Sequence, residues 1–126
     1  MKINLGITAI LGFLAIVLGA FGAHALKSKI GLDQLKVFET GVRYQMYHVF
    51  VLLFVNTYAG FSQKIKNRIS ILFFIGILLF SGSLYCLSTE IIATKLIGPI
   101  TPLGGLFFII GWLMLAFQFF KKQTTS

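Results

Sequence analysis

The chain has 126 residues, of which 57% are hydrophobic and only 11% are charged, with a formal net charge of +8. Ordinary soluble domains carry about 25% charged residues, and a chain this short buries too little apolar surface to hide it from water. The composition excludes a soluble globular protein. It predicts one all-α, multi-pass membrane domain over residues 1–126.

The positive charge does not indicate nucleic-acid binding, because no basic run is long enough to form a nucleic-acid-binding tail. The basic residues lie instead at the ends of apolar stretches, for example Lys2, Lys27, Lys29, residues 64–68 and Lys121. At these places Lys and Arg meet anionic headgroups, and each contributes about 1 kcal/mol of attraction. We expect membrane lipids as partners and no nucleic acid.

The first transmembrane helix is predicted over residues 4–25, because residues 3–23 carry no charge and about 20 apolar residues cross a bilayer. Its small residues form one helical stripe, made of Gly12, Ala15, Gly19 and Gly22. Small residues let helices approach closely in lipid. We therefore expect this helix at the centre of the bundle, or at a contact between copies of the chain in a homo-oligomer.

A polar segment joins the first two spans. Asp33 is a favourable N-cap, and apolar residues recur after it at helical spacing. We expect a short helix over residues 33–40 that lies in the membrane interface, since it is too short to span. Gly41 permits a bend, after which the second transmembrane helix is predicted over residues 42–60.

The third and fourth transmembrane helices are predicted over residues 67–89 and 102–120. Asn67 is a plausible start for the third helix, and Thr101 followed by Pro102 is a typical start for the fourth. The complete expectation is a bundle of four transmembrane helices with a short interfacial helix between the first and the second.

Orientation depends on the distribution of Lys and Arg. A cytoplasmic N-terminus places six of them inside, namely Lys2, Lys64, Lys66, Arg68, Lys121 and Lys122. Five then lie outside, namely Lys27, Lys29, Lys36, Arg43 and Lys95. Cytoplasmic loops are enriched in Lys and Arg. The sequence thus favours both termini inside.

The candidate site is a polar patch at the outer edge of the membrane, made of His24, Glu39, Arg43, Tyr44 and His48. Glu39 with Arg43, and Tyr44 with His48, are pairs four residues apart, and His24 is expected at the same membrane level. In a functional interpretation, Arg43 binds an anion and a histidine supplies a titratable donor. In a structural interpretation, Arg43 pairs with Glu39, the histidines cap helix ends and the tyrosines belong to the interface belt.

We assign no catalytic, cofactor-binding or metal-binding residue from the sequence. His24, Glu39 and His48 are far apart and lack the short spacings of zinc ligands. Ser81, Ser83 and Cys86 are possible nucleophiles, but no base lies at helical spacing to them. An enzyme is therefore the less favoured class.

Four motifs in order indicate a family: GAFGAHAL at residues 19–26, FETGVRYQMYH at 38–48, FSGSLY at 80–85, and TPLGG with a following GW at 101–112. Together they resemble the small four-span membrane proteins of domain-of-unknown-function family 423, which includes transmembrane protein 256. The resemblance covers nearly the whole chain. It implies a bacterial inner-membrane or organellar four-helix protein and brings no activity or catalytic residue with it.

The function that the sequence favours is non-enzymatic: an integral membrane protein whose polar patch binds lipid headgroups or a partner protein. The alternative is a carrier or pore formed by an oligomer, with the patch at its mouth. Asn56, an amide well inside a span, and Ser83 would then line the path. An intramembrane enzyme ranks third.

Overall fold

The computed structural model describes residues 2–90 and 94–121 of the chain. The first long helix covers Ile3–Leu26 and consists of α1 (Ile3–Ile16), the π-helical segment η1 (Val17–Gly22) and α2 (Ala23–Leu26). The second is α3 (Leu32–Thr57).

The third long helix covers Gln63–Thr89 and consists of α4 (Gln63–Gly76), the π-helical segment η2 (Ile77–Ser81) and α5 (Gly82–Thr89). A single turn, α6 (Thr94–Ile97), precedes α7 (Ile100–Phe120). The long helices therefore match the four predicted ones to within a few residues, apart from the start of the second.

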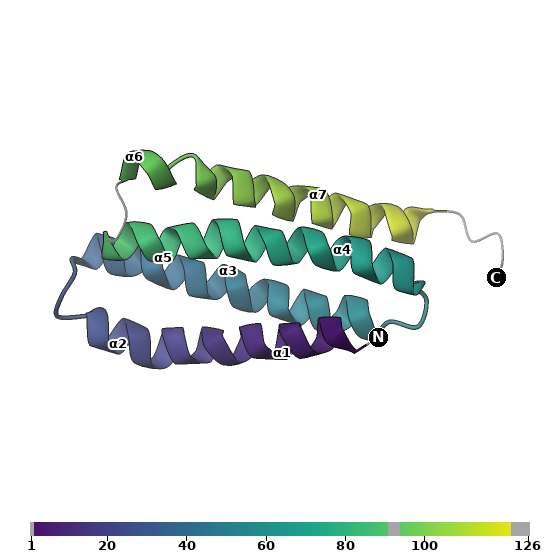
Figure 1. The fold of residues 1–126 in the computed structure, drawn as a ribbon, viewed down its shortest axis with the longest axis horizontal. Coiled ribbons are helices and arrows are strands. Elements are labelled where there is room, and N and C mark those ends of the chain that lie inside the picture. Colours follow the sequence, from purple (N-terminus) through teal and green to yellow (C-terminus); the bar gives the residue numbers. More distant parts are fainter. Residues whose placement is uncertain (1, 91–93, 122–126) are drawn as a thin grey trace.

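The four long helices run antiparallel in chain order, as a row (Figure 1). The first long helix packs on α3. In turn, α3 packs on the third long helix, which consists of α4, η2 and α5, and the third long helix packs on α7. Within the described ranges, the long helices thus follow one another in chain order, with α1 at one edge and α3 in the interior, and side chains of α3 also reach α7. The prediction that the first helix is central is wrong.

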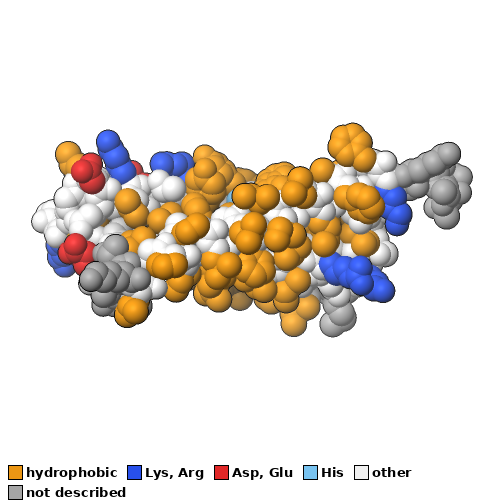
Figure 2. Space-filling model, turned by 90° about the horizontal axis from the view of Figure 1, so that it is seen from above, with side chains coloured by type: hydrophobic (Ala, Val, Ile, Leu, Met, Phe, Trp, Pro, Cys, Tyr) orange, Lys and Arg blue, Asp and Glu red, His pale blue; other side chains and the backbone are white. Residues whose placement is uncertain are grey.

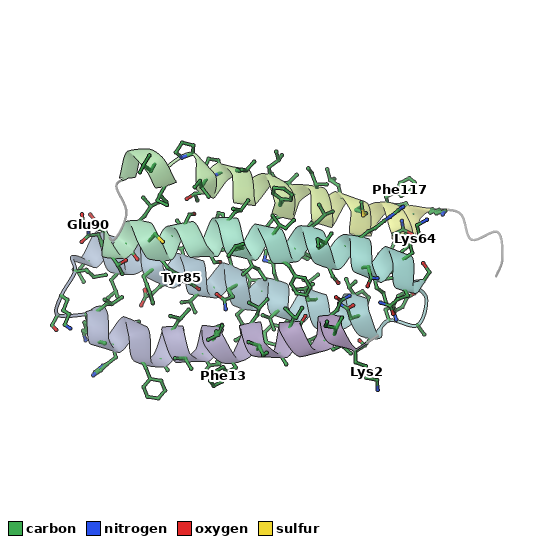
Figure 3. The ribbon with its side chains drawn as sticks, in the orientation of Figure 1. Lys2, Phe13, Lys64, Tyr85, Glu90 and Phe117 are labelled. Atoms are coloured by element: carbon green, nitrogen blue, oxygen red, sulfur yellow. The ribbon has the colours of Figure 1, made fainter. Side chains whose placement is uncertain are left out.

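Within residues 2–90 and 94–121, three helices are long and apolar enough to cross a membrane: Ile3–Leu26, Gln63–Thr89 and Ile100–Phe120. Figure 2 shows hydrophobic side chains over the middle of the molecule, Lys and Arg at both ends, and Asp and Glu at one end. In Figure 3, Lys2 and Lys64 lie at one end and Glu90 at the other. The protein is an all-α membrane protein.

The second helix differs from the prediction at its start. No bend occurs at Gly41, because α3 is continuous from Leu32 to Thr57 and includes the segment expected as a separate interfacial helix. Gly41 is buried, and a Cβ atom there would lie 2.7 Å from the ring of Tyr85. Its carbonyl also accepts a hydrogen bond of 2.7 Å from Ser81 Oγ. Gly41 therefore allows the third long helix to approach α3 closely and does not form a turn.

Two helix starts also differ from the predicted caps. Gly31, in an extended conformation, precedes α3, and its N–H donates to Gln34 Oε1 at 3.1 Å. Asp33 is therefore a first-turn acid, which the helix dipole favours. Ser62, and not Asn67, caps α4 by accepting a hydrogen bond from the N–H of Ile65.

The stripe of small residues on the first helix faces α3. A Cβ atom at Gly12 would lie 3.3 Å from Val49, and one at Gly19 would lie 3.1 Å from Val42. These residues thus serve a contact inside the chain. Homo-oligomer formation stays a prediction, and a contact between copies would have to use other residues of α1.

The seam between α4 and α7 is built from glycines that receive phenylalanines of the facing helix. A Cβ atom at Gly76 would lie 2.5 Å from Phe108, and one at Gly111 would lie 2.6 Å from Phe73. Phe73 is fully buried and belongs to the main apolar core. Without a hydrophobic driving force between helices in lipid, such close packing holds them together.

Gly104 offers a sharp test of this seam, because a Cβ atom there would lie 2.3 Å from the backbone nitrogen of Phe80. Gly104→Ala should lower the stability of the protein by about 1–3 kcal/mol through overpacking. Thermal unfolding in detergent, followed by circular dichroism, measures the effect.

Gly105→Ala is the matched control, since the nearest atom to its Cβ would be 3.9 Å away. It should leave the melting temperature unchanged or raise it, because Ala favours helix by up to about 1 kcal/mol over Gly. Equal melting temperatures for the two variants would contradict the packing described for Gly104.

Candidate functional site

The structure divides the predicted polar patch between two faces of α3. Arg43 is exposed beside the first long helix, whereas His48 is 4% exposed and lies against α7 and Phe73 of α4. Tyr44 contacts His48 and Phe80 on this second face. His24 is exposed in α2. The five residues therefore do not converge on one cavity, and His24 does not meet His48.

A groove of about 320 Å³ opens between the first helix and α3. Ile16, Gly19 and Ala20 line one wall, and Met46, Tyr47 and Phe50 line the other. Arg43 is the charged residue among its described lining residues. This groove is thus apolar, carries one cation and is accessible from the side of the molecule.

Arg43 does not pair with Glu39 in the described structure. Its Nη2 atom donates to Thr40 Oγ1 at 3.4 Å, which is a long hydrogen bond to a neutral oxygen. Glu39 is partly exposed and makes no hydrogen bond or ion pair with another described residue. Both charges are therefore accessible to a ligand.

The imidazole of His48 is fully engaged. Trp112 Nε1–H donates to His48 Nε2 at 3.0 Å, and because an indole nitrogen can only donate, Nε2 carries no proton. His48 Nδ1 then holds the proton and donates to the backbone oxygen of Tyr44 at 2.7 Å. Phe108 stacks on the ring, with 3.7 Å between centroids and 8° between planes. This geometry fixes a neutral histidine that joins α3 to α7.

An aromatic cleft of about 460 Å³ lies beside this histidine, lined by Tyr44, Phe80, Phe108 and Trp112. Since both nitrogens of His48 are already bonded, the imidazole has no free donor or acceptor for a ligand in the cleft. The geometry assigns His48 to helix association.

Gln45 is a second buried polar group of α3 that the sequence did not mark as important. It is 3% exposed, donates through Nε2 to the backbone oxygen of Leu11 at 2.7 Å, and accepts through Oε1 from Tyr85 at 2.7 Å. Figure 3 shows Tyr85 reaching from α5 toward α3. Gln45 therefore links three long helices, and it lines a further groove of about 390 Å³ between them.

A third polar cluster lies where the first, second and third long helices meet. Asn4 Nδ2 donates to Asn56 at 3.0 Å and to Asn67 at 2.9 Å, and Asn56 Nδ2 donates to Ser70 at 2.8 Å. Sequence reasoning noted Asn56 as an amide inside a span but missed its partners. Asn4 and Asn67 both lie near the N-terminal ends of their helices, the first and the third, which run in the same direction, so both side chains lie at the same end of the bundle.

Residues 18–105 of the chain match the family described as "Protein of unknown function (DUF423)". The chain belongs to the DUF423 family. This finding confirms the resemblance that the four sequence motifs carry.

DUF423 relatives include the UPF0382 membrane protein SSP2132 of Staphylococcus saprophyticus, 43% identical over 96% of this chain and 99% of the relative. The UPF0382 membrane protein YwdK of Bacillus subtilis is 47% identical over 91% of this chain and 94% of the relative. The UPF0382 inner membrane protein YgdD of Escherichia coli is 38% identical over 85% and 81%. No solved structure matches the chain. These relatives are bacterial membrane proteins, and their names carry no enzymatic activity.

The two serines that could act as nucleophiles in this DUF423 protein are hydrogen-bonded within the fold. Ser81 donates to the backbone of Gly41, and Ser83 forms a hydrogen bond with Thr101 of α7. Cys86 is a free thiol and is partly exposed. Among the described residues, no group of three His, Cys, Asp or Glu side chains is placed to hold a metal ion.

The His48–Trp112 bond can be measured by a double-mutant cycle with His48→Phe, Trp112→Phe and the double variant. We expect a coupling energy of about 0.6 kcal/mol and at most about 1.7 kcal/mol, the range of interhelical hydrogen bonds in membranes. Unfolding in a denaturing detergent, followed by circular dichroism, provides the four stabilities.

A cycle of His48→Phe with Leu113→Ala is the control, because Leu113 is 64% exposed on α7. Its coupling energy should be near zero. A coupling energy for the His48–Trp112 cycle no larger than that of the control would contradict a stabilising role for this bond.

Proposed function

We propose that this protein is a non-catalytic, four-span membrane protein that binds a membrane lipid in the groove between the first helix and α3. The observation that carries the proposal is Arg43, an exposed cation that lines an apolar, sideways-opening groove and, among the described residues, has only a long hydrogen bond to Thr40. The groove receives an acyl chain, and Arg43 binds the phosphate of the headgroup.

The depth of Arg43 supports a lipid as its partner. Gly19 packs against Val42, so Arg43 lies about seven residues, or roughly 10 Å, inward from the end of α2 at Leu26. An unpaired charge at this depth is costly, and long cationic side chains reach toward the headgroup region. A phosphate in the groove satisfies the guanidinium with charge-assisted hydrogen bonds.

The carrier or pore alternative has less support. Its candidate lining residues, Asn56 and Ser83, are each bonded to a neighbouring helix. Asn56 bonds to α1 and α4, whereas Ser83 bonds to α7, so the two side chains lie in different contacts between helices and do not line one common path. The enzyme alternative has less support because both nitrogens of His48 are engaged, and His24 is exposed on α2, away from His48.

Arg43→Ala should remove most of the phospholipid that remains bound to the purified protein, because the groove then offers no contact to the phosphate. Native mass spectrometry after gentle detergent extraction counts the lipids bound per chain. Arg43→Lys should keep part of the binding, since an ammonium retains the charge without the bidentate geometry.

Lys29→Ala is the control for this experiment. It removes an exposed cation near the same end of the molecule but outside the groove, so lipid occupancy should stay at the wild-type level. If Arg43→Ala, correctly folded by circular dichroism, bound as much lipid as the wild type, the proposed function would be wrong.

We also propose that α3 crosses the membrane and that both termini are cytoplasmic. Its 26 residues suffice for a span, and its polar side chains Gln45, His48 and Asn56 are buried while Phe50 and Leu53 are exposed. The end of the molecule with Lys2 and Lys64 carries basic charge, as cytoplasmic ends do.

Labelling of single cysteines tests this topology in a Cys86→Ser background. Ser28→Cys and Ala59→Cys place exposed thiols just before and just after α3. A membrane-impermeant maleimide applied to intact cells should label position 28 and spare position 59 until the cells are opened. Labelling of both positions from outside would contradict a crossing by α3, and the reverse pattern would contradict the orientation.

A further inference from the structure

We infer that the lipid headgroup held by this groove is phosphoethanolamine, with its phosphate on Arg43 and its primary ammonium on Glu39. The inference rests on the proposed lipid-binding function and adds the class of lipid and a second contact residue.

Glu39 is aligned with the groove. At 100° per residue, Glu39, Arg43, Met46 and Phe50 fall within an arc of about 60° on α3. Arg43, Met46 and Phe50 line the groove, so Glu39 lies on its continuation. Four residues correspond to about 6 Å along the axis, or one helical turn, between Glu39 and Arg43.

The two charges are free to receive a ligand. Arg43 donates only to the hydroxyl of Thr40 at 3.4 Å, and Glu39 has no partner among the described residues. A cation and an anion that lie one turn apart without contacting each other are complementary to a zwitterion. The two-carbon linker of phosphoethanolamine separates its phosphate and ammonium by a comparable distance.

The order of the groups along the membrane normal also agrees. The apolar part of the groove, with Phe50, lies toward the membrane interior, Arg43 follows, and Glu39 lies one turn nearer the start of α3. A phospholipid presents its acyl chains, its phosphate and its amine in the same order. A chain in the groove therefore places the amine at the level of Glu39.

Other common headgroups leave Glu39 poorly matched. Phosphoglycerol carries no cation, so its lipid would bring a net negative charge beside the carboxylate. Phosphocholine carries a cation but no N–H, so it cannot donate a hydrogen bond to Glu39. The site should prefer the ethanolamine lipid over both.

The test uses the full-length, delipidated protein in detergent, titrated separately with dioleoyl phosphatidylethanolamine, phosphatidylcholine and phosphatidylglycerol. Native mass spectrometry gives the affinity for each lipid. The wild type should bind the ethanolamine lipid roughly fivefold more tightly than the other two, the scale of one solvent-accessible ion pair. Glu39→Gln should abolish this preference while still binding phosphatidylglycerol.

Asp33→Asn is the matched control, because Asp33 is an exposed acid of the same helix that lies outside the groove. It should leave the preference unchanged. Circular dichroism verifies that every variant is folded.

The outcomes separate the inference from the function on which it rests. If Arg43→Ala reduces binding of all three lipids but Glu39→Gln keeps the ethanolamine preference, or if the wild type prefers phosphatidylglycerol, the inference is overturned and lipid binding stands. If Arg43→Ala changes the affinity for none of the lipids, both are overturned.

Discussion

The structure depends on the hydrogen-bonding demands of α3. In the proposed crossing of the membrane by α3, hydrocarbon offers no water, so each polar side chain of this helix inside the bilayer must find its partner within the protein. Gln45 bonds to the first helix and to Tyr85, His48 bonds to Trp112 of α7, and Asn56 bonds to the first and third helices. Three polar groups of one helix thus bind all of its neighbours, and their directions determine where each neighbour lies.

Glycines make these bonds geometrically possible. Gly41 lets Tyr85 approach α3 closely enough for the phenol to reach Gln45. Gly76 and Gly111 bring α4 and α7 together, which places Trp112 within hydrogen-bonding distance of His48. Close packing and hydrogen bonding therefore act on the same contacts, and they replace the hydrophobic force that lipid does not supply between helices.

The all-α fold and the approximate helix bounds follow from the distribution of charge, because a long uncharged stretch has few alternatives in a membrane. The continuity of α3 through Gly41 could not be predicted in this way, since a glycine permits both a bend and a close contact and only the facing Tyr85 decides between them. For the same reason the four-residue spacing suggested the pairs Glu39 with Arg43 and Tyr44 with His48 but could not say which neighbouring helix each pair meets; the rings of Tyr44 and His48 are in contact, whereas Arg43 bonds to Thr40 and not to Glu39. The engagement of His48 by Trp112, 64 residues away, lies beyond any local pattern.

The same constraint explains why ligand binding is proposed at Arg43 and not at the larger hollows. The cleft beside His48 and the groove over Gln45 are roomier, at about 460 and 390 Å³ against about 320 Å³. The imidazole of His48 and the amide of Gln45, however, already bond within the protein, so a polar ligand that used either group would have to displace one of those bonds. Glu39 and Arg43 face outward, where no helix of the described chain completes their hydrogen bonds. Polar groups that the fold does not use are the ones available to the lipid that surrounds it.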